Sequence, residues 1–343
     1  MKRKLLALAL TATMVLGLAA CGGSGSSSSA APAAGGAESS AAAAGGAEMT
    51  SEWAPSGTVS IVVPAGAGGD TDLTARTFAQ YAKGLTGVDF IVVNANGASG
   101  SVASNQVLQS ANDGMTFLYG HTLVNVANIA GITDFNYTAF TLGPTFAKNP
   151  AQGLYVNAEK YADLNAFIEA AKAAPGQLKA ATEVGAYTYY ELLAFEKAAG
   201  IDLDLVDAGS NSDKITAMLS GQIDLMPGAY LNCKEYIEAG QFVCIGAPTA
   251  EAYEITPDVP VLKEEGIDLV YPDCDYSFYF PADTDPAIIA YYDELVAKVL
   301  EDPDAQKALK DLPVMPYYLT SEESAANEET MYNTIKEIAD SLA

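Results

Sequence analysis

The sequence predicts an α/β protein with two lobes of alternating strands and helices and a cleft between them. Strands and helices alternate from about residue 58, and a second run of the same make begins near residue 145. From residue 273 the pattern changes to one strand and two helices, which indicates a return to the first lobe. Strand–helix–strand repetition at this spacing favours right-handed βαβ units and parallel sheets. Clefts between lobes are where small ligands bind.

The elements of the first lobe follow from β-branched runs and helical spacing. Strands are expected at 58–63, 89–93 and 115–120, and helices from about residue 71 and over 101–111. In the first helix, four apolar residues have the spacing i, i+3, i+4, i+7 of one buried face: Ala75, Phe78, Ala79 and Ala82.

The second lobe repeats this alternation with shorter elements. Strands are expected at 152–157, 178–182, 203–208, 223–228 and 242–247, and helices at 161–176, 188–200, 212–221 and 231–240. The returning segment holds an expected strand at 274–280 and helices at 286–301 and 321–342.

The N-terminus is typical of an exported lipoprotein. "MKRK" precedes the apolar run "LLALALTATMVLGLA", and "LAAC" ends in Cys21 after small residues. We expect a signal peptide over 1–20, lipid on Cys21, and a Gly/Ser/Ala-rich tether over 21–52. A plain signal peptide cut after Ala20, or an uncleaved anchor, remains open. The implied location is extracytoplasmic, on the cell membrane.

Charge and composition exclude several classes of protein. The formal net charge is -26, and loss of Lys2, Arg3 and Lys4 would leave 14 basic against 43 acidic residues, or -29. Such a surface repels nucleic acid and anionic membranes. A single histidine and no C-x-x-C make a zinc site improbable, and no cofactor is expected.

Three cysteines follow the expected lipidation site: Cys233, Cys244 and Cys274. An odd number does not form a complete disulfide framework. Free thiols are favoured, and a Cys233–Cys244 pair remains open.

Two glycine-rich loops follow similar strands, in "IVVPAGAGGDTD" (61–72) and "IVVNANGASG" (91–100). Neither completes G-x-G-x-x-G, and no lysine follows either loop as a P-loop requires. A loop that ends a strand and starts a helix points backbone N–H groups, and the positive end of the helix dipole, at one spot. Glycine lets an anion approach this backbone closely. Two such loops side by side suit a carboxylate, although tight turns alone would also use glycine.

These loops resemble those of the extracytoplasmic solute-binding proteins of tripartite tricarboxylate transporters. The resemblance continues through "AAKAAPGQLKAAT", "AMLSGQIDLM", "TPDVPVLKEEGID" and "FPADTDPAIIA", so it runs from about residue 57 to the C-terminus. It implies a periplasmic-binding-protein-like (type II, Venus flytrap) fold without catalysis. It also implies a carboxylate held by both loops, partly through water, and a membrane permease as partner. The implied lobes are 56–144 plus 276–343, and 145–275, closing about 144–146 and 272–276.

The resemblance assigns ligand-binding roles residue by residue. The first loop contributes Ala65, Gly66, Gly68, Gly69, Asp70, Thr71 and Asp72, the last placed to hold a bridging water. The second contributes Asn96, Gly97, Ala98, Ser99, Gly100 and Ser101, and the turn after the third strand contributes His121 and Thr122. From the second lobe come a loop over 182–188, with Thr182, Val184, Gly185 and Thr188, and then Gly209, Ser210 and Gly228.

Some of these positions depart from the family pattern or have a second interpretation. His121 stands where the family offers a hydroxyl, and it is expected either to donate to the ligand or to be a surface or packed histidine. Gly228 replaces a frequent acid. Arg76 is expected in a structural ion pair rather than as a carboxylate clamp. Aromatic walls or core packing are expected of Tyr187, Tyr189 and Tyr190.

The favoured function is that of a monomeric transport receptor that delivers a small carboxylate to a permease. A sensor that reports the same ligand to a membrane receptor is the alternative. An enzyme is not expected, because the chain has no G-x-S-x-G or H-E-x-x-H and only His121 as an imidazole base. The sequence does not name the ligand. Dicarboxylates, tricarboxylates, acidic amino acids and aromatic acids would each present one carboxylate to the same loops.

Overall fold

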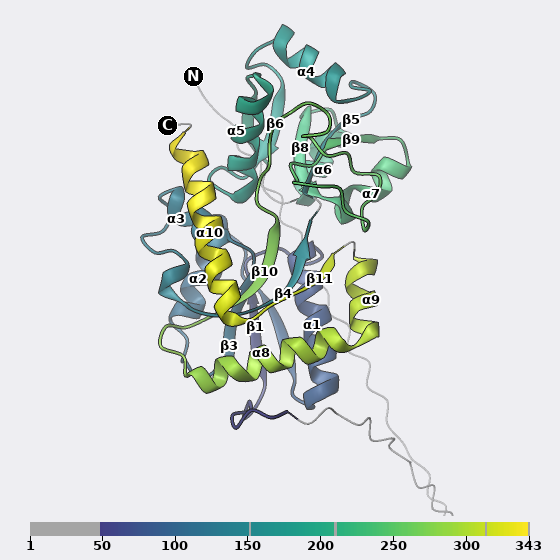
Figure 1. Cartoon of the computed structure of the whole chain (residues 1–343). Helices are drawn as coiled ribbons and strands as arrows, with labels where there is room; N and C mark the ends of the chain where they lie inside the picture. The colour runs from purple at the N-terminus through teal and green to yellow at the C-terminus, as the bar shows by residue number, and fades with distance from the viewer. Residues whose placement is uncertain (1–48, 151, 209–210, 313, 342–343) are drawn as a thin grey trace, which may run out of the picture. The chain divides into compact units, whose positions relative to one another are not determined.

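The computed structural model describes residues 49–150, 152–208, 211–312 and 314–341. The expected signal peptide, Cys21 and most of the tether lie outside the described residues, as do Gly209 and Ser210. The described residues belong to one compact unit, Gly45–Ala343. Within it, two sheets form two lobes (Figure 1).

The first lobe is built on a six-stranded sheet in the order β11-β4-β10-β3-β1-β2. Its strands are β1 (Val59–Val63), β2 (Phe90–Asn94), β3 (Thr116–Gly120), β4 (Thr141–Asn149), β10 (Cys274–Phe280) and β11 (Met315–Leu319). Its helices are α1 (Asp70–Thr86), α2 (Ser101–Leu108), α3 (Leu123–Ile129), α8 (Pro286–Glu301), α9 (Pro303–Asp311) and α10 (Ser321–Asp340), with short 3-10 turns η1 (Ala98–Gly100) and η2 (Tyr137–Ala139).

The second lobe is built on a five-stranded sheet in the order β7-β6-β8-β5-β9. Its strands are β5 (Gln152–Asn157), β6 (Lys179–Thr182), β7 (Asp204–Asp207), β8 (Leu225–Ala229) and β9 (Phe242–Gly246). Its helices are α4 (Leu164–Ala173), α5 (Tyr187–Ala199), α6 (Asn211–Leu219) and α7 (Tyr230–Glu238).

Both sheets are mixed, so the expected parallel pairing holds for only part of each sheet. The β2-β1-β3 and β7-β6-β8 groups are parallel, as the βαβ repetition requires. In the first lobe, β10 pairs antiparallel with both β3 and β4. The physical reason is the path of the chain: β4 leaves the first lobe and β10 returns to it, so the two strands run in opposite directions. Cys274 of β10 pairs with Asn149 of β4, and the expected lobe boundary at 144/145 falls inside β4.

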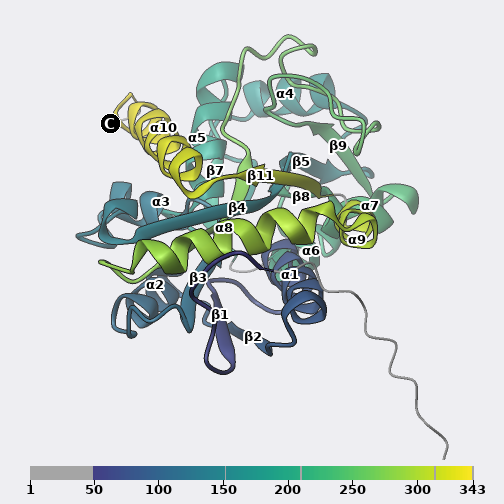
Figure 2. The same cartoon turned by 60° about the horizontal axis from the view of Figure 1, so that its bottom comes forward.

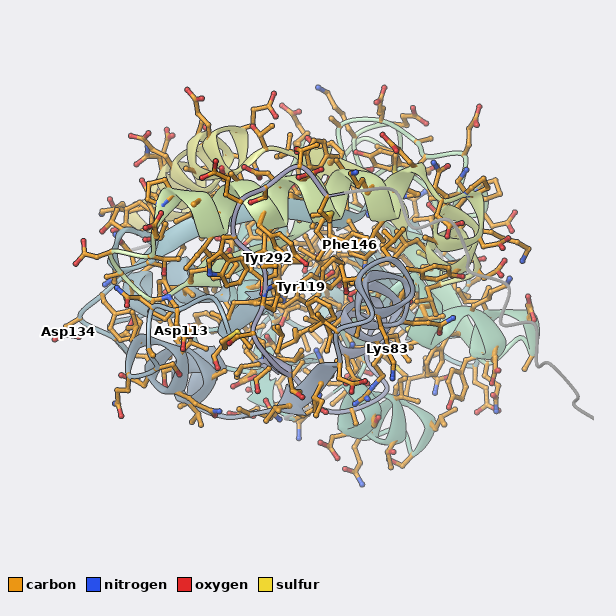
Figure 3. The ribbon with its side chains drawn as sticks, turned by 90° about the horizontal axis from the view of Figure 1, so that it is seen from below. Lys83, Asp113, Tyr119, Asp134, Phe146 and Tyr292 are labelled. Carbon is orange, nitrogen blue, oxygen red and sulfur yellow. The ribbon has the colours of Figure 1, made fainter. Side chains whose placement is uncertain are left out.

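The first lobe has an aromatic core around α1. All four residues of the predicted apolar face of this helix are buried. The Phe78 ring lies 4.9 Å from that of Phe278, which stacks on Phe117 at 4.6 Å. Such pairs contribute about 0.5–1.5 kcal/mol beyond the burial of their surface. Figure 3 shows Phe146 and Tyr292 inside this lobe, with the charged side chain of Asp134 at its edge.

Helix α8 lies along β4 and anchors the described end of the tether (Figure 2). The N–H groups of Thr50 and Ser51 donate to the Glu294 carboxylate at 2.8–3.0 Å. The Trp53 ring meets the Tyr291 ring edge-on at 5.1 Å. Residues 49–53 are thus attached to the first lobe, although part of this stretch is expected to be tether.

Candidate ligand-binding site

A cavity of about 610 Å³ lies between the two lobes at the carboxyl ends of the parallel strands. The first glycine loop (residues 64–69) follows β1, and the second (95–100) follows the neighbouring strand β2. Both loops and the turn after β3 form one wall. The opposite wall comes from the loop after β6, from β7 and from α5, α6 and α7. The arrangement therefore places the two loops side by side and facing the second lobe.

The lining contains most of the site residues expected from the first lobe. The expected residues that line it are Ala65, Gly66, Gly68, Gly69, Asp70, Thr71, Asn96, Gly97, Ser99, Gly100, His121 and Thr188. The expected residues outside the lining are Asp72, Ala98, Ser101, Thr122, Thr182, Val184, Gly185 and Gly228.

Asp72 lies beneath the first glycine loop and braces it. This carboxylate is 1% exposed, and it accepts from Gly68 N (2.9 Å), Asn94 Nδ2 (2.9 Å) and both Nε and Nη2 of Arg76 (3.0 and 2.8 Å). Burial alone would raise the pKa of Asp72, but the donors from Arg76, Gly68 and Asn94 hold it below its usual value. Arg76 thus forms the structural ion pair expected of it.

The other expected residues outside the lining have structural contacts. Thr122 is buried beside Asn125, which donates to its hydroxyl, and the hydroxyls of Thr182 and Thr188 bond at 2.8 Å. Val184 is half exposed. Gly228 lies within β8, opposite Gly153 of β5. Ala98 forms part of η1, Ser101 begins α2, and Gly185 has a positive φ of 77°.

The second glycine loop has a tighter backbone and bonds across the cleft. Ala98 and Ser99 both have positive φ angles, 47° and 51°, and Gly100 has φ 85°. A Cβ on Gly100 would lie 3.2 Å from that of Leu123, so glycine is required there. The Ser99 N–H donates to Glu183 Oε1 at 3.1 Å, and Glu183 belongs to the second lobe. A carboxylate of the protein itself therefore occupies one donor of this loop.

His121 lies at the cavity with its Nδ1 unbonded to any described residue. Its ring approaches Tyr187 at 5.6 Å and Tyr276 at 6.2 Å. Burial lowers the pKa of His121 to about 4, against the opposing effect of Asp70. The imidazole is therefore neutral near pH 7, and it offers one N–H donor and one acceptor.

Lys214 is the lining residue of greatest consequence that sequence reasoning missed. It lies on α6, is 5% exposed, and forms no hydrogen bond or ion pair with any other described residue. Burial lowers the pKa of its amine, and nearby carboxylates, first that of Glu191, oppose this shift. A signal existed: Lys214, Ile215 and Met218 share the buried face of α6, an unusual place for a lysine.

Behind this wall, Glu191 of α5 is fully buried, and neither carboxylate oxygen has a hydrogen-bond partner among the described residues. Burial raises the pKa of Glu191 to about 8, with Lys214 acting in the opposite direction. The Glu191 carboxyl is therefore largely protonated at pH 7.

Other second-lobe residues complete the wall. Glu183 lies in the loop 182–188 that the resemblance indicates, although the sequence did not single out its side chain. Further lining residues that the sequence missed are Pro64, Leu123, Gln152, Asp207, Asn211, Ser212, Ile215, Asn232 and Cys274. Cys233, Cys244 and Cys274 are all free thiols, which confirms the favoured prediction.

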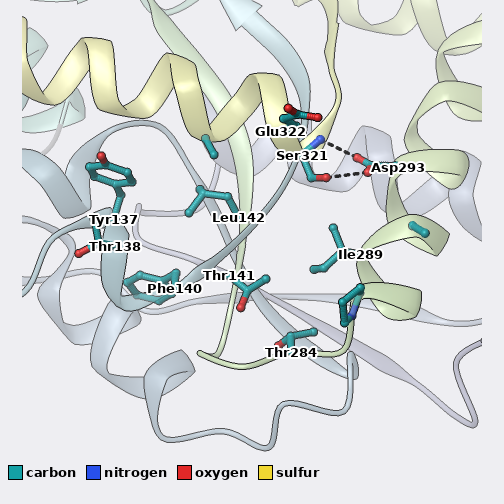
Figure 4. Close-up of a pocket in the computed structure, with 13 residues that line it drawn as sticks. Tyr137, Thr138, Phe140, Thr141, Leu142, Thr284, Ile289, Asp293, Ser321 and Glu322 are labelled. Carbon is teal, nitrogen blue, oxygen red and sulfur yellow. Dashed lines mark hydrogen bonds between the residues drawn. The ribbon is translucent and has the colours of Figure 1, made fainter.

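A second cavity of about 610 Å³ lies on the first lobe, between η2, β4, α8 and the start of α10 (Figure 4). Its walls are largely apolar, from residues such as Phe140, Leu142 and Ile289. At one side, Ser321 donates to the Asp293 carboxylate through its N–H and hydroxyl at 2.8 and 2.7 Å. It contains none of the expected site residues.

Comparison with known proteins identifies the family. Residues 74–341 match the profile of the "Tripartite tricarboxylate transporter family receptor". The chain belongs to this receptor family. It is therefore an extracytoplasmic solute-binding protein, as the resemblance predicted, and its family is one of receptors rather than enzymes.

Two relatives illustrate how far the receptor resembles named proteins. It is 27% identical over 288 residues to "UPF0065 protein in gbd 5'region" of Cupriavidus necator, covering 81% of this chain and 85% of the relative. It is 23% identical over 291 residues to BugT of Bordetella pertussis, and the match covers 81% of this chain and 87% of BugT.

Solved structures confirm the two-lobed fold. MatC of Rhodopseudomonas palustris, solved with bound malate, matches at a TM-score of 0.76 and 22% identity, covering 83% of the receptor and 99% of MatC. Rpa4515 of the same organism, solved with adipate, matches at a TM-score of 0.78 and 21% identity. The match covers 84% of the receptor and 98% of Rpa4515. At these identities the likeness shows the fold alone.

Membrane-spanning helices and metal clusters are both absent from the described part of the receptor. None of its described helices is both long and apolar enough to cross a bilayer. Within the same residues, no group of three His, Cys, Asp or Glu side chains is placed to hold a metal ion.

Proposed function

We propose that the receptor captures a small carboxylate in the cavity between its lobes and delivers it to the permease of a tripartite tricarboxylate-type transporter. The observation that carries this proposal is the convergence of three kinds of donor on one cavity: the N–H groups of the glycine loops, the neutral imidazole of His121, and the buried amine of Lys214. A buried amine that forms no hydrogen bond or ion pair with any described residue is suited to bind a carboxylate.

The structural neighbours support the chemical class. MatC is solved with malate and Rpa4515 with adipate, both small carboxylates. The proposal also includes what the N-terminal sequence predicts: signal peptide 1–20, lipid on Cys21, tether 21–52, and a location outside the membrane. It further includes the expected monomeric state. Lobe closure about residues 144–146 and 272–276 would present the loaded form to the permease.

The test is a thermal-shift screen of the purified receptor against small carboxylic acids and their amides. A ligand at 100 times its Kd stabilises the folded state by about 2.7 kcal/mol, which is a readable shift. We expect at least one acid to shift the melting temperature while its amide does not.

A matched pair of variants assigns the effect to the cavity. Lys214→Met should weaken binding of that acid by about tenfold or more, because it removes a charged donor. Lys263→Met, at an exposed position of the same lobe, should bind as the wild type does. Unchanged binding by Lys214→Met, or no shift with any acid, would count against the proposal.

A further inference from the structure

We propose that the ligand is a zwitterion that carries a primary ammonium group beside its carboxylate, as an α-amino acid does. This inference rests on the proposed function, since it assumes that the cavity binds a carboxylate. It narrows the ligand to a class that the glycine loops by themselves do not select.

The charges on the cavity walls motivate the inference. Three carboxylates line it: Asp70 from the first lobe, and Glu183 and Asp207 from the second. Lys214 is the one lysine or arginine in the described lining, and His121 is neutral near pH 7. A ligand with carboxylates alone would bring further negative charge to this excess, whereas an ammonium group would offset it.

Asp70 is the best-placed acceptor for that ammonium group. Its Oδ2 accepts from Asn149 Nδ2 at 2.9 Å and from the Tyr276 hydroxyl. Its Oδ1 accepts no hydrogen bond from any described residue. Asp70 is also the first residue of α1, where the helix dipole stabilises a negative charge. The carboxylate is thus oriented by two donors and retains an unused oxygen.

Glu183 favours the same class of ligand. Its carboxylate already accepts the Ser99 N–H of the second glycine loop. A second ligand carboxylate at this loop would compete with Glu183 for the donor and be repelled by its charge. An ammonium group placed beside the Glu183 carboxylate would instead be attracted to it.

Lys214 supplies the complementary half of the site. Glu191, behind it, is fully buried, and its pKa is raised by burial to about 8, so it neutralises the amine only in part. Because Lys214 lies on the second lobe and Asp70 on the first, a zwitterion would bond to both lobes at once. Lobe closure would then depend on both of its charges.

The experiment is isothermal titration of the full chain with the standard L-amino acids. For each amino acid that binds, two matched compounds are then titrated: the acid without the α-amino group, and the α-carboxamide. We expect at least one amino acid to bind, with both matched compounds weaker by about tenfold or more, because each loses one charged contact.

Two variants assign the contacts. Asp70→Asn should weaken binding of the amino acid by about tenfold or more, while binding of the deaminated acid stays unchanged or becomes tighter. Lys214→Met should weaken binding of both compounds. If thermal unfolding shows that Asp70→Asn is misfolded, Glu183→Gln replaces it. This variant should also weaken binding of the amino acid more than binding of the deaminated acid, but by a smaller factor.

The outcomes separate this inference from the proposed function. A deaminated acid that binds as tightly as its amino acid overturns the zwitterion and leaves carboxylate capture standing. Tight binding of a dicarboxylate that disappears when EDTA is added would also overturn the zwitterion and leave carboxylate capture standing. In that case a metal ion, rather than an ammonium group, would supply the positive charge. If no carboxylate binds in any form, both proposals fail.

Discussion

The first glycine loop is stabilised from within its own lobe, whereas the second also bonds to the opposite lobe. Beneath the first loop, Asp72 accepts from Gly68, Arg76 and Asn94. In the second loop, the Ser99 N–H donates to Glu183 across the cleft. The first loop thus has its shape whatever the second lobe does, while the second loop has a contact that opening of the lobes would break. Similar loops are therefore held in different ways: the first by contacts within its own lobe, and the second by a contact between the lobes as well.

The largest expected effect follows from removing the brace of the first loop. Asp72→Ala leaves buried donors unpaired and should lower the free energy of unfolding by about 3 kcal/mol. This value is at the low end for a broken buried pair, because the Arg76 side chain is half exposed. Urea denaturation measures the loss. Asp89→Ala is the matched control, because the Lys83–Asp89 pair on the same lobe is exposed and should contribute less than about 1 kcal/mol.

The same variant has a signature in pH. Because the pKa of Asp72 is lowered in the folded state, its stabilisation is present above the unfolded value of 3.8 and is lost as the pH falls through the lower folded-state pKa. The difference in unfolding free energy between wild type and Asp72→Ala should therefore shrink in acid. A difference that stays constant down to pH 2 would show that charge is not its origin.

A comparison of glycine substitutions sharpens the contrast between the loops. Gly100→Ala combines a left-handed φ of 85° with a close approach to Leu123 and should cost about 2 kcal/mol of stability. Gly68→Ala has the same φ but open space, and should cost about 1 kcal/mol. Gly66→Ala has neither and should lie within about 0.5 kcal/mol of wild type. Equal effects in urea denaturation would refute this ordering.

Breaking the contact across the cleft should act on closure more than on folding. Glu183→Ala removes a hydrogen bond to a charged acceptor and should shift the balance between closed and open forms by about 1.5 kcal/mol toward the open form. Small-angle scattering of the ligand-free receptor should report a larger radius of gyration. The exposed Glu264→Ala is the control. Unchanged scattering would mean that the contact does not stabilise closure.

The smallest effect is expected from Ser99→Ala. The Ser99 hydroxyl lies 3.5 Å from Glu183 Oε1, at the limit of a hydrogen bond, and the backbone N–H still donates in the variant. Scattering and stability should stay within about 0.5 kcal/mol of wild type. A loss as large as that of Glu183→Ala would assign the contact to the hydroxyl instead.

Much of the fold could be predicted because local patterns specify it. The strand at 152–157 and the helix at 286–301 have the bounds expected from the sequence. The elements that the prediction missed are α3, β4, α9 and β11. In β4, Gly143 and Pro144 interrupt the strand pattern, and in β11 Pro316 does so. Pairing with neighbouring strands overrides these weak local preferences, and only the folded sheet supplies those neighbours.

The sequence by itself determined the family, the order of the elements and the two glycine loops after β1 and β2, because strand-to-helix turns are local features of the backbone. The tertiary structure decided which side chains surround the cavity. Glu183 meets Ser99 across 84 residues of chain, and Lys214 loses its water only when α6 packs. Partners distant in sequence, and the removal of water from a charge, arise only when the lobes are assembled. The set of charges that lines the cavity is therefore a property of the folded receptor.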